Sequence, residues 1–352
     1  MTDVTAVPVT AVDSSATTAR LLAEAAGRID APDVVIAVSR GGVRTVHTGG
    51  SAEPGPVPRE RLHHELGSAS KPFAGLLLAR LVAQGRVRYE DRAADLLAPG
   101  LPVHPSVRRI TLRHLLTHTS GLPGLPADFY PQAVPRWSSD PYGNYPADRV
   151  VRAFLRARPR HRPGTRWHYS NFAVSVLGHT LAAATGTPWE VLLHQQVLAP
   201  LALEATLLRP GPEGTDAIGH RRDGTPLPAL DTGGFTAAGA LRSTPLDLLT
   251  FLEAHLGAAD LQDTSLSTAL AEVTRPVLRR GRRHAHTHTL TWFQHPTPYG
   301  PALFHAGATL GQQAFLGFRP ETGLAVAATA TRRVHRKDTF VATAYELLTE
   351  MP

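Results

Sequence analysis

Residues 67–72 read Gly67-Ser68-Ala69-Ser70-Lys71-Pro72, and they open the most apolar helical pattern in the chain. A spacing of three residues puts Ser68 and Lys71 on one helical face, so the lysine amine can reach the serine hydroxyl. A serine hydroxyl is a poor nucleophile unless a base lies beside it. Near a helix N-terminus, the backbone N–H of Ser68 is also free to bind a developing oxyanion. The stretch therefore indicates a nucleophilic serine, with a capping serine beside a surface lysine as the alternative.

The use of lysine sets Lys71 apart. Of the 36 basic residues, only Lys71 and Lys337 are lysines. Arginine stays protonated in proteins, whereas a buried lysine can lose its proton and act as a base. A lysine kept against this strong preference for arginine is a candidate for such chemistry. Lys337 lies in a charged run near the C-terminus, and we expect it to be a solvated surface residue.

The composition is that of a globular protein and excludes several kinds of site. The chain has 352 residues, of which 42% are hydrophobic and 18% charged. Cysteine is absent, which excludes disulfides, cysteine nucleophiles and iron–sulfur clusters. We predict neither a cofactor nor a metal. His286 and His288 would share a strand face and His284 lies close by, but a surface loop running into a strand is the simpler interpretation.

Charge and hydropathy limit the partners that we expect. The net charge is +7, but the arginines are spread along the chain, and the densest cluster, at residues 275–283, lacks interleaved aromatic residues. We therefore expect no nucleic-acid partner. Residues 1–13 have no basic start and no apolar core, and residues 73–83 are too short to span a bilayer. These features predict a cytoplasmic protein without a membrane partner.

The order of the expected elements predicts an α/β (α+β) fold. Strand patterns occur at residues 34–39 and 43–48 and again at 287–293, 313–318 and 324–331. Helical patterns occupy both ends, at 17–29 and 341–348, and fill the middle. We predict one antiparallel sheet built from both chain ends, flanked by the terminal helices, with a mostly helical region inserted. The expected division is residues 1–60 and 285–352 against 61–284, with the active site between them. The middle helices are expected at 71–84, 112–117, 146–156, 172–184, 188–198 and 245–256.

A second motif, Tyr169-Ser170-Asn171, leads into the helix expected at 172–184. A tyrosine held near cations can have a lowered pKa and pass protons. Asn171 could hydrogen-bond the substrate or the lysine. The similar Tyr142-Gly143-Asn144 lies in the Pro/Gly-rich loop 123–145 and ranks lower. We expect this loop to control substrate choice, with Trp137, Tyr142 and Tyr145 either walling a pocket or packing the loop.

A third motif, His305-Ala306-Gly307, precedes the last strand hairpin. Its small residues would let a substrate backbone lie along a strand edge. The backbone N–H of Ala308 would then be a second oxyanion donor beside that of Ser68.

In this order the three motifs resemble those of the serine β-lactamase and penicillin-binding-protein superfamily. The histidine of the third motif is similar to that of the branch containing class C β-lactamases, D-alanyl-D-alanine carboxypeptidases and related esterases. Residues 110–123 and 237–248 are similar to two further stretches of these proteins, so the resemblance covers about residues 34–350.

The resemblance implies the roles of the candidate residues. Ser68 would attack a carbonyl and form an acyl-enzyme, while Lys71 and Tyr169 would share the general-base and proton-relay work, either of them taking the first proton. The substrate-binding residues would be those of the second and third motifs: Asn171, which orients substrate or Lys71, His305 and Gly307 at the pocket edge, and Ala308 in the oxyanion hole.

One departure from the family pattern bears on function. A Lys-Thr-Gly triplet is absent, and His305-Ala306-Gly307 stands in its place. This weakens recognition of a β-lactam carboxylate and favours an intracellular esterase, peptidase or acyltransferase acting on a small ester, amide or peptide. The absence of Gly-x-Ser-x-Gly disfavours an α/β-hydrolase. The alternative is a penicillin-binding-like protein that binds a ligand or partner without turnover.

Overall fold

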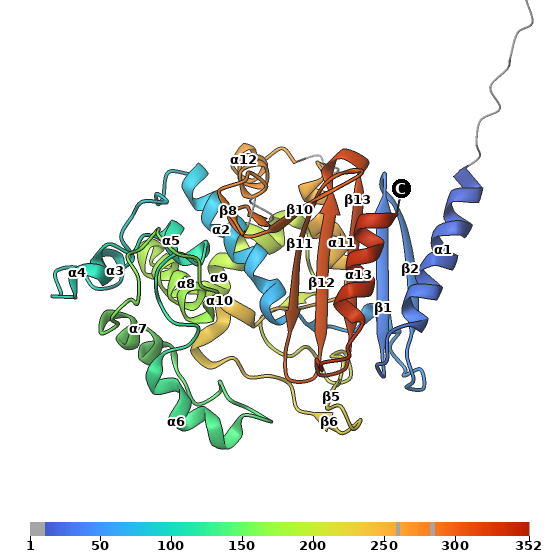
Figure 1. Cartoon of the computed structure of the whole chain (residues 1–352), viewed down its shortest axis with the longest axis horizontal. Helices are drawn as coiled ribbons and strands as arrows, with labels where there is room; N and C mark the ends of the chain where they lie inside the picture. Colours follow the sequence, from blue (N-terminus) through green and yellow to red (C-terminus); the bar gives the residue numbers. More distant parts are fainter. Residues whose placement is uncertain (1–10, 258–260, 282–285, 352) are drawn as a thin grey trace, which may run out of the picture.

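The architecture of the chain is an eight-stranded antiparallel sheet packed against a helical region (Figure 1). The computed structural model describes residues 11–257, 261–281 and 286–351. The strand order is β2-β1-β13-β12-β11-β10-β9-β8, so strands from the two ends of the chain meet where β1 pairs with β13. This confirms the predicted fold class. The strands of this sheet are β1 (Val34–Arg40), β2 (Val43–Gly49), β8 (Leu278–Arg280), β9 (His286–His288), β10 (Phe293–Thr297), β11 (Gly300–Ala308), β12 (Gln313–Arg319) and β13 (Leu324–Ala330).

The central strands are buried on both faces because helices cover each side of the sheet. The terminal helices α1 (Ala11–Gly27) and α13 (Phe340–Glu350) pack on one face (Figure 1). Helix α11 (Pro245–His255) packs on the other face, against β1, β12 and β13. Side chains alternate between the two faces of a strand. Val326 and Ala328 thus join the core under the terminal helices, and Ala325 and Ala327 join the core of the helical region.

The part of the sheet from β8 to β11 differs from the prediction, which placed only one strand there. The prediction of a single strand at residues 287–293 is wrong, because the chain makes a turn within this stretch. Thr289 N donates to Trp292 O (3.0 Å), and Trp292 N donates to Thr289 Oγ1 (2.9 Å). This turn separates β9 from β10. Strand β11 was not predicted, since its nine residues begin with Gly300-Pro301 and follow no simple alternation.

The inserted region is built around the buried helix α8 (Asn171–Thr185). The loop expected at 123–145 contains only short helical turns, including α6 (Tyr130–Ala133). The helix expected at 188–198 is an α-helix that continues as a π-helix (His194–Leu198). Several helices of this region, the longest of them at Thr264–Val273, were not predicted. The remaining helices are α2 (Lys71–Ala83), α3 (Ala93–Leu97), α4 (Pro105–Arg108), α5 (Leu112–Leu116), α7 (Ala147–Leu155), α9 (Trp189–Leu193), α10 (Thr236–Gly239) and α12 (Thr264–Val273). Short strands, β3 (His64–Glu65), β4 (Thr206–Leu207), β5 (Gly219–His220), β6 (Pro226–Leu227) and β7 (Arg242–Ser243), form two small sheets.

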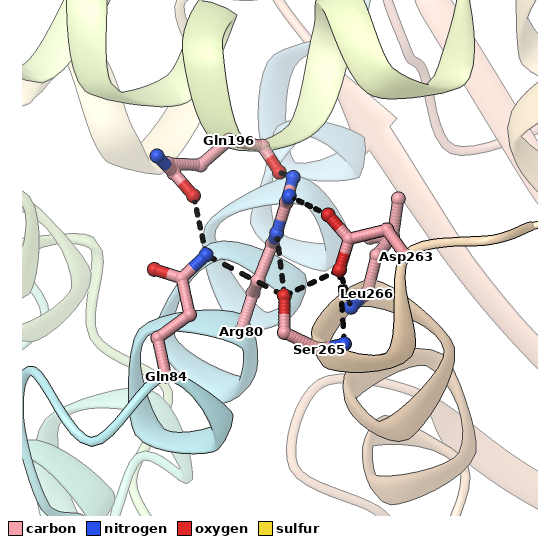
Figure 2. Close-up of polar contacts among 6 residues, drawn as sticks. All are labelled: Arg80, Gln84, Gln196, Asp263, Ser265 and Leu266. Atoms are coloured by element: carbon pink, nitrogen blue, oxygen red, sulfur yellow. Dashed lines mark hydrogen bonds and ion pairs between the residues drawn. The ribbon is translucent and has the colours of Figure 1, made fainter.

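Helix α2 is fixed by a polar network at its C-terminal half (Figure 2). The buried guanidinium of Arg80 pairs with Asp263 and donates to the carbonyl of Gln196. Asp263 in turn caps α12, accepting from the backbone N–H groups of Ser265 (2.9 Å) and Leu266 (3.1 Å). The network ties α2 to two neighbouring helical segments, so the first turn of α2 is held by a rigid element. Within the described ranges, no helix combines the length and apolar character that crossing a bilayer requires.

Candidate active site

The hydroxyl of Ser68 is contacted by two side chains from different parts of the chain. Ser68 lies in a 3₁₀ turn (Gly67–Ser70) that runs directly into α2, and Lys71 is the first residue of that helix. Lys71 Nζ lies 2.8 Å from Ser68 Oγ, and Tyr169 Oη donates to the same oxygen at 2.7 Å. Tyr169 stands just before α8, whose N-terminus is capped by Ser170. The structure thus brings together the three residues that the sequence singled out for chemistry.

Burial gives the lysine and the tyrosine different protonation behaviour. Lys71 is 2% exposed, and its removal from water lowers its pKa to about 7. Its Nζ also donates to the carbonyl of Ala238 (2.8 Å), and no carboxylate counterion pairs with it within the described part of the chain. Burial also raises the pKa of Tyr169 to about 12, although the hydrogen bond with Ser68 lowers it. The expectation of a lowered tyrosine pKa was therefore wrong, because desolvation outweighs the hydrogen bond with Ser68.

Strand β11 passes directly over the serine turn. Gly67 has a φ of +50°, and a Cβ there would collide with the carbonyl of Ala308. A Cβ on Gly307 would collide with the backbone of residues 66–69. Only glycine permits both approaches. The third motif therefore lies against the first.

The end of β11 leaves one strand edge open. The β10–β11 pairing stops at Phe293 opposite Phe304, whereas β11 continues to pair with β12 as far as Ala308. Thr309 N donates to Gln312 O (2.9 Å), so the alternation of an antiparallel ladder turns the Ala308 N–H away from β12. Ala308 and Ser68 line the same cavity, so this edge of β11 adjoins the serine.

A cavity of about 50 Å³ adjoins Ser68. None of the residues that line this cavity is charged. Asn171 contributes a buried Oδ1 for which the described residues supply no hydrogen-bond partner. Tyr142, from the lower-ranked motif, lies beside Asn171 and forms part of the wall. The other lining residues are Gly67, Leu230, Thr232, Phe235, Ala238, Gly239 and Ala308.

Comparison with known proteins fits this arrangement. Residues 18–350 match the Beta-lactamase family. The chain belongs to the beta-lactamase family. This confirms the superfamily to which the three motifs pointed.

Two curated relatives are similar to this beta-lactamase-family chain over parts of their length. A D-alanyl-D-alanine-carboxypeptidase/endopeptidase AmpH of Escherichia coli is 26% identical over 238 residues, covering 64% of this chain and 58% of the relative. A Beta-lactamase of Pseudomonas fluorescens is 29% identical over 207 residues, covering 56% and 52%. The matches thus span somewhat more than half of the length of each relative.

Solved structures establish the fold over nearly the whole chain. A Beta-Lactamase/D-Alanine Carboxypeptidase from Pseudomonas syringae superposes with a TM-score of 0.80 at 21% identity, covering 97% of this chain and all of that one. A class C beta lactamase from Rhodobacter sphaeroides gives 0.77 at 23% identity, covering 96% and 99%.

In this beta-lactamase-family chain, His305 does not line the cavity beside Ser68. It is 3% exposed and lines a second cavity of about 20 Å³ together with Lys71, His118 and His288. Burial lowers the pKa of His305 to about 3 and that of His288 to about 4. These imidazoles are therefore neutral at physiological pH, and the third motif supplies no positive charge to the substrate cavity.

His118 is a functional candidate that the sequence analysis missed. Its φ of +58° is unusual for a residue other than glycine. Its Nδ1 accepts the backbone N–H of Ser170 (3.2 Å), and its ring centroid lies 4.5 Å from that of Tyr169. His118 thus packs against the ring of Tyr169 and helps to hold its phenol in position. The only sequence signal was its place within the family-like stretch 110–123.

A buried ion pair holds the loop that walls the substrate cavity. Glu65 Oε1 accepts from Arg242 Nη1 (2.9 Å) and from Leu230 N (2.7 Å). Arg242 Nη2 donates to Leu230 O (3.0 Å), so both backbone groups of Leu230 are clamped. Sequence reasoning also missed this clamp, because its three residues are far apart in the chain.

The histidines that suggested a metal do not form a site in the described ranges. No group of three or more His, Asp or Glu side chains there could hold a metal ion. His286 Nδ1 lies 3.3 Å from His295 Nε2, whereas His288 Nε2 accepts from Arg280 (2.9 Å). His284 lies outside the described residues, as do Arg282 and Arg283 of the arginine cluster.

Proposed function

We propose that this protein is a serine hydrolase that cleaves uncharged esters of small acyl groups through an acyl-enzyme on Ser68. The observation that carries the proposal is the contact of Lys71 Nζ and Tyr169 Oη with one serine oxygen. A hydroxyl held between a neutral amine and a protonated phenol is activated on one side and retains a proton donor on the other.

Lys71 is the base in this proposal. A pKa of about 7 leaves a large fraction of the amine unprotonated near neutral pH. The neutral amine accepts the proton of Ser68 as Oγ attacks the substrate carbonyl carbon. Tyr169, with its pKa of about 12, stays protonated and is the donor to the departing alkoxide. The two pKa values, displaced in opposite senses, support this division of roles, which the sequence left open.

The carbonyl oxygen would gain its negative charge between two backbone donors. The Ser68 N–H lies in the 3₁₀ turn before α2, and the Ala308 N–H lies on the open edge of β11. Preorganised backbone donors stabilise a tetrahedral oxyanion without having to reorganise during the reaction. Gly307 and Gly67 allow β11 to lie close to the serine turn, and this close approach sets the distance between the two N–H donors.

The cavity supports a small, uncharged acyl group. Its volume of about 50 Å³ leaves space for only a few heavy atoms, and its lining contains no Arg, Lys or charged His. A carboxylate buried there would have no cation to offset its lost hydration. A neutral ester fits better than a β-lactam or peptide that presents a carboxylate. Asn171 Oδ1, buried and unpaired among the described residues, is the polar group available to orient such a substrate.

Release of the acyl group to water gives hydrolysis, and release to an alcohol or amine gives transfer. Hydrolysis is the activity proposed. Transfer is the second outcome to be measured, because the same acyl-enzyme leads to both.

The test is hydrolysis of p-nitrophenyl acetate, butyrate and octanoate by the wild type, Ser68→Ala and the control Ser51→Ala. Ser51 is an exposed serine outside the site. We expect turnover of the shorter esters by the wild type and control, none by Ser68→Ala, and a covalent acyl adduct on Ser68 by intact mass. Equal rates in all three proteins would refute the proposal. Faster release of p-nitrophenol on adding alcohols, with ester products, would identify transfer instead.

A further inference from the structure

A second, larger cavity lies outside the active site. Its volume is about 810 Å³, within the range of sites that take small molecules. Helix α7 and the segment after it form one side, and residues 123–130 form the other. Phe172, at the start of α8, contributes to the lining. Nothing in the proposed ester chemistry uses this cavity.

Five arginines line this cavity, and three of them have no counterion. Arg149 pairs with Asp128 (3.0 Å), and Arg152 pairs with Asp148. Among the described residues, no carboxylate pairs with the side chains of the other three. Those three occur at every second position after α7, and the side chain of each is exposed to solvent. They are Arg156, Arg158 and Arg160. Like charges gathered in one hollow repel each other and create a field that attracts an anion.

The same cavity also has an apolar part. Leu125, Ala153, Ala157 and Phe172 line it together with the arginines. Guanidinium groups bind phosphates and carboxylates through paired N–H donors, and apolar walls take up hydrocarbon or ring surface. The lining therefore suits a ligand that carries both anionic groups and apolar surface.

The wall of the cavity is held in place by hydrogen bonds to backbone carbonyl groups. Arg160 N donates to Gly121 O (2.9 Å), and Phe172 N donates to Gly124 O (3.0 Å). Pro123 O accepts from Ser170 Oγ at 2.6 Å. The arginine-bearing segment and the opposite loop are thus joined in a fixed arrangement, which reduces the ordering cost of binding.

We propose that this arginine-lined cavity binds a small organic molecule that carries at least two anionic groups, phosphate or carboxylate, on an apolar body. The site is separate from the cavity beside Ser68.

The test is calorimetric titration of the full chain with ADP, pyrophosphate, citrate and suberate at about 50 mM and about 200 mM salt. The variant is Arg156→Gln/Arg158→Gln/Arg160→Gln. The control is Arg61→Gln/Arg86→Gln/Arg336→Gln, which removes the same charge from exposed arginines elsewhere. Circular dichroism and ester hydrolysis check that both are folded. Single Arg158→Gln replaces the triple variant if the latter does not fold.

We expect at least one of the four anions to bind the wild type and the control, with affinity falling at the higher salt. Binding by the cavity variant should be weaker by at least about tenfold. The preference between the two phosphate probes and the two carboxylate probes then identifies the anionic group. Two results would overturn the proposal: no binding of any probe to the wild type, or the same affinity in the cavity variant and the control variant, whether binding is weakened in both or in neither.

Discussion

Gly307 of β11 lies so close to Ser68 that a Cβ on Gly307 would stand 2.9 Å from the backbone nitrogen of Ser68. The carbonyl of Leu66 would be closer still. Two segments separated by more than two hundred residues therefore touch through backbone alone. This contact sets the gap between the two proposed oxyanion donors, and the first prediction depends on it.

Gly307→Ala should separate β11 from the serine turn. Backbone atoms cannot move aside as a flexible side chain can, so we expect a loss of about 1–3 kcal/mol in the free energy of unfolding. Ester kcat should fall by about a hundredfold, the effect of losing one oxyanion donor. Urea unfolding and p-nitrophenyl ester kinetics measure the two effects. Gly55→Ala, at a glycine with open space around it, should change neither, and a similar loss there would contradict the argument.

Lys71 should impose a pH dependence on acylation. Below its pKa of about 7 the amine is protonated and cannot accept the serine proton, whereas above it the amine is neutral. Ester kcat/KM should therefore rise with pH and reach half of its plateau near pH 7. The buried histidines beside it titrate well below this range. A pH–rate profile measures this.

Lys71→Arg is the matched variant for that profile. It keeps a positive charge but cannot be deprotonated, so kcat/KM should fall by about 10²–10⁴-fold. The pH–rate profile should also no longer show the rise near pH 7. Activity that is retained with the same profile would exclude Lys71 as the base.

Tyr169→Phe separates protonation of the leaving group from activation of the serine. The variant keeps the ring and loses only the hydroxyl that lies 2.7 Å from Ser68 Oγ. An alkyl ester has a basic leaving group that needs a proton, whereas p-nitrophenolate leaves readily without one. We expect about a 10²–10⁴-fold loss for ethyl esters and a much smaller loss for p-nitrophenyl esters. Equal losses for both would argue for a positioning role instead.

Glu65→Gln should loosen the wall of the substrate cavity. It leaves Arg242 buried without its counterion and weakens the hold on Leu230. Breaking a buried pair in this way costs about 3–5 kcal/mol, and we also expect an increased KM, because Leu230 lines the cavity. Chemical denaturation and ester kinetics measure these. In contrast, Glu24→Gln removes the exposed partner of Arg20 and should change stability by less than about 1 kcal/mol.

Local patterns were sufficient to predict the sheet from both chain ends and most of the helices. Strands 34–39, 313–318 and 324–331 could be predicted because each is a short apolar run bounded by a turn. Strand β11 could not, since its glycines and proline suit close contact with the serine turn rather than an alternating pattern. The strand predicted at 287–293 failed because Thr289 and Trp292 close a turn inside it.

The proximity of Ser68 and Lys71 follows from the sequence alone, because a spacing of three positions places them one helical turn apart. The pairing of Tyr169 with Ser68, the clamp on Leu230 and the packing of His118 behind the tyrosine were decided only by the tertiary structure. Each joins residues whose distance depends on how whole elements pack. The pKa values have the same origin, since Lys71 and Tyr169 are shifted mainly by burial, which no local pattern encodes. The sequence thus determined which groups could react, and the packing of the helical region against the sheet determined how these groups are oriented and in which direction burial shifts their pKa values.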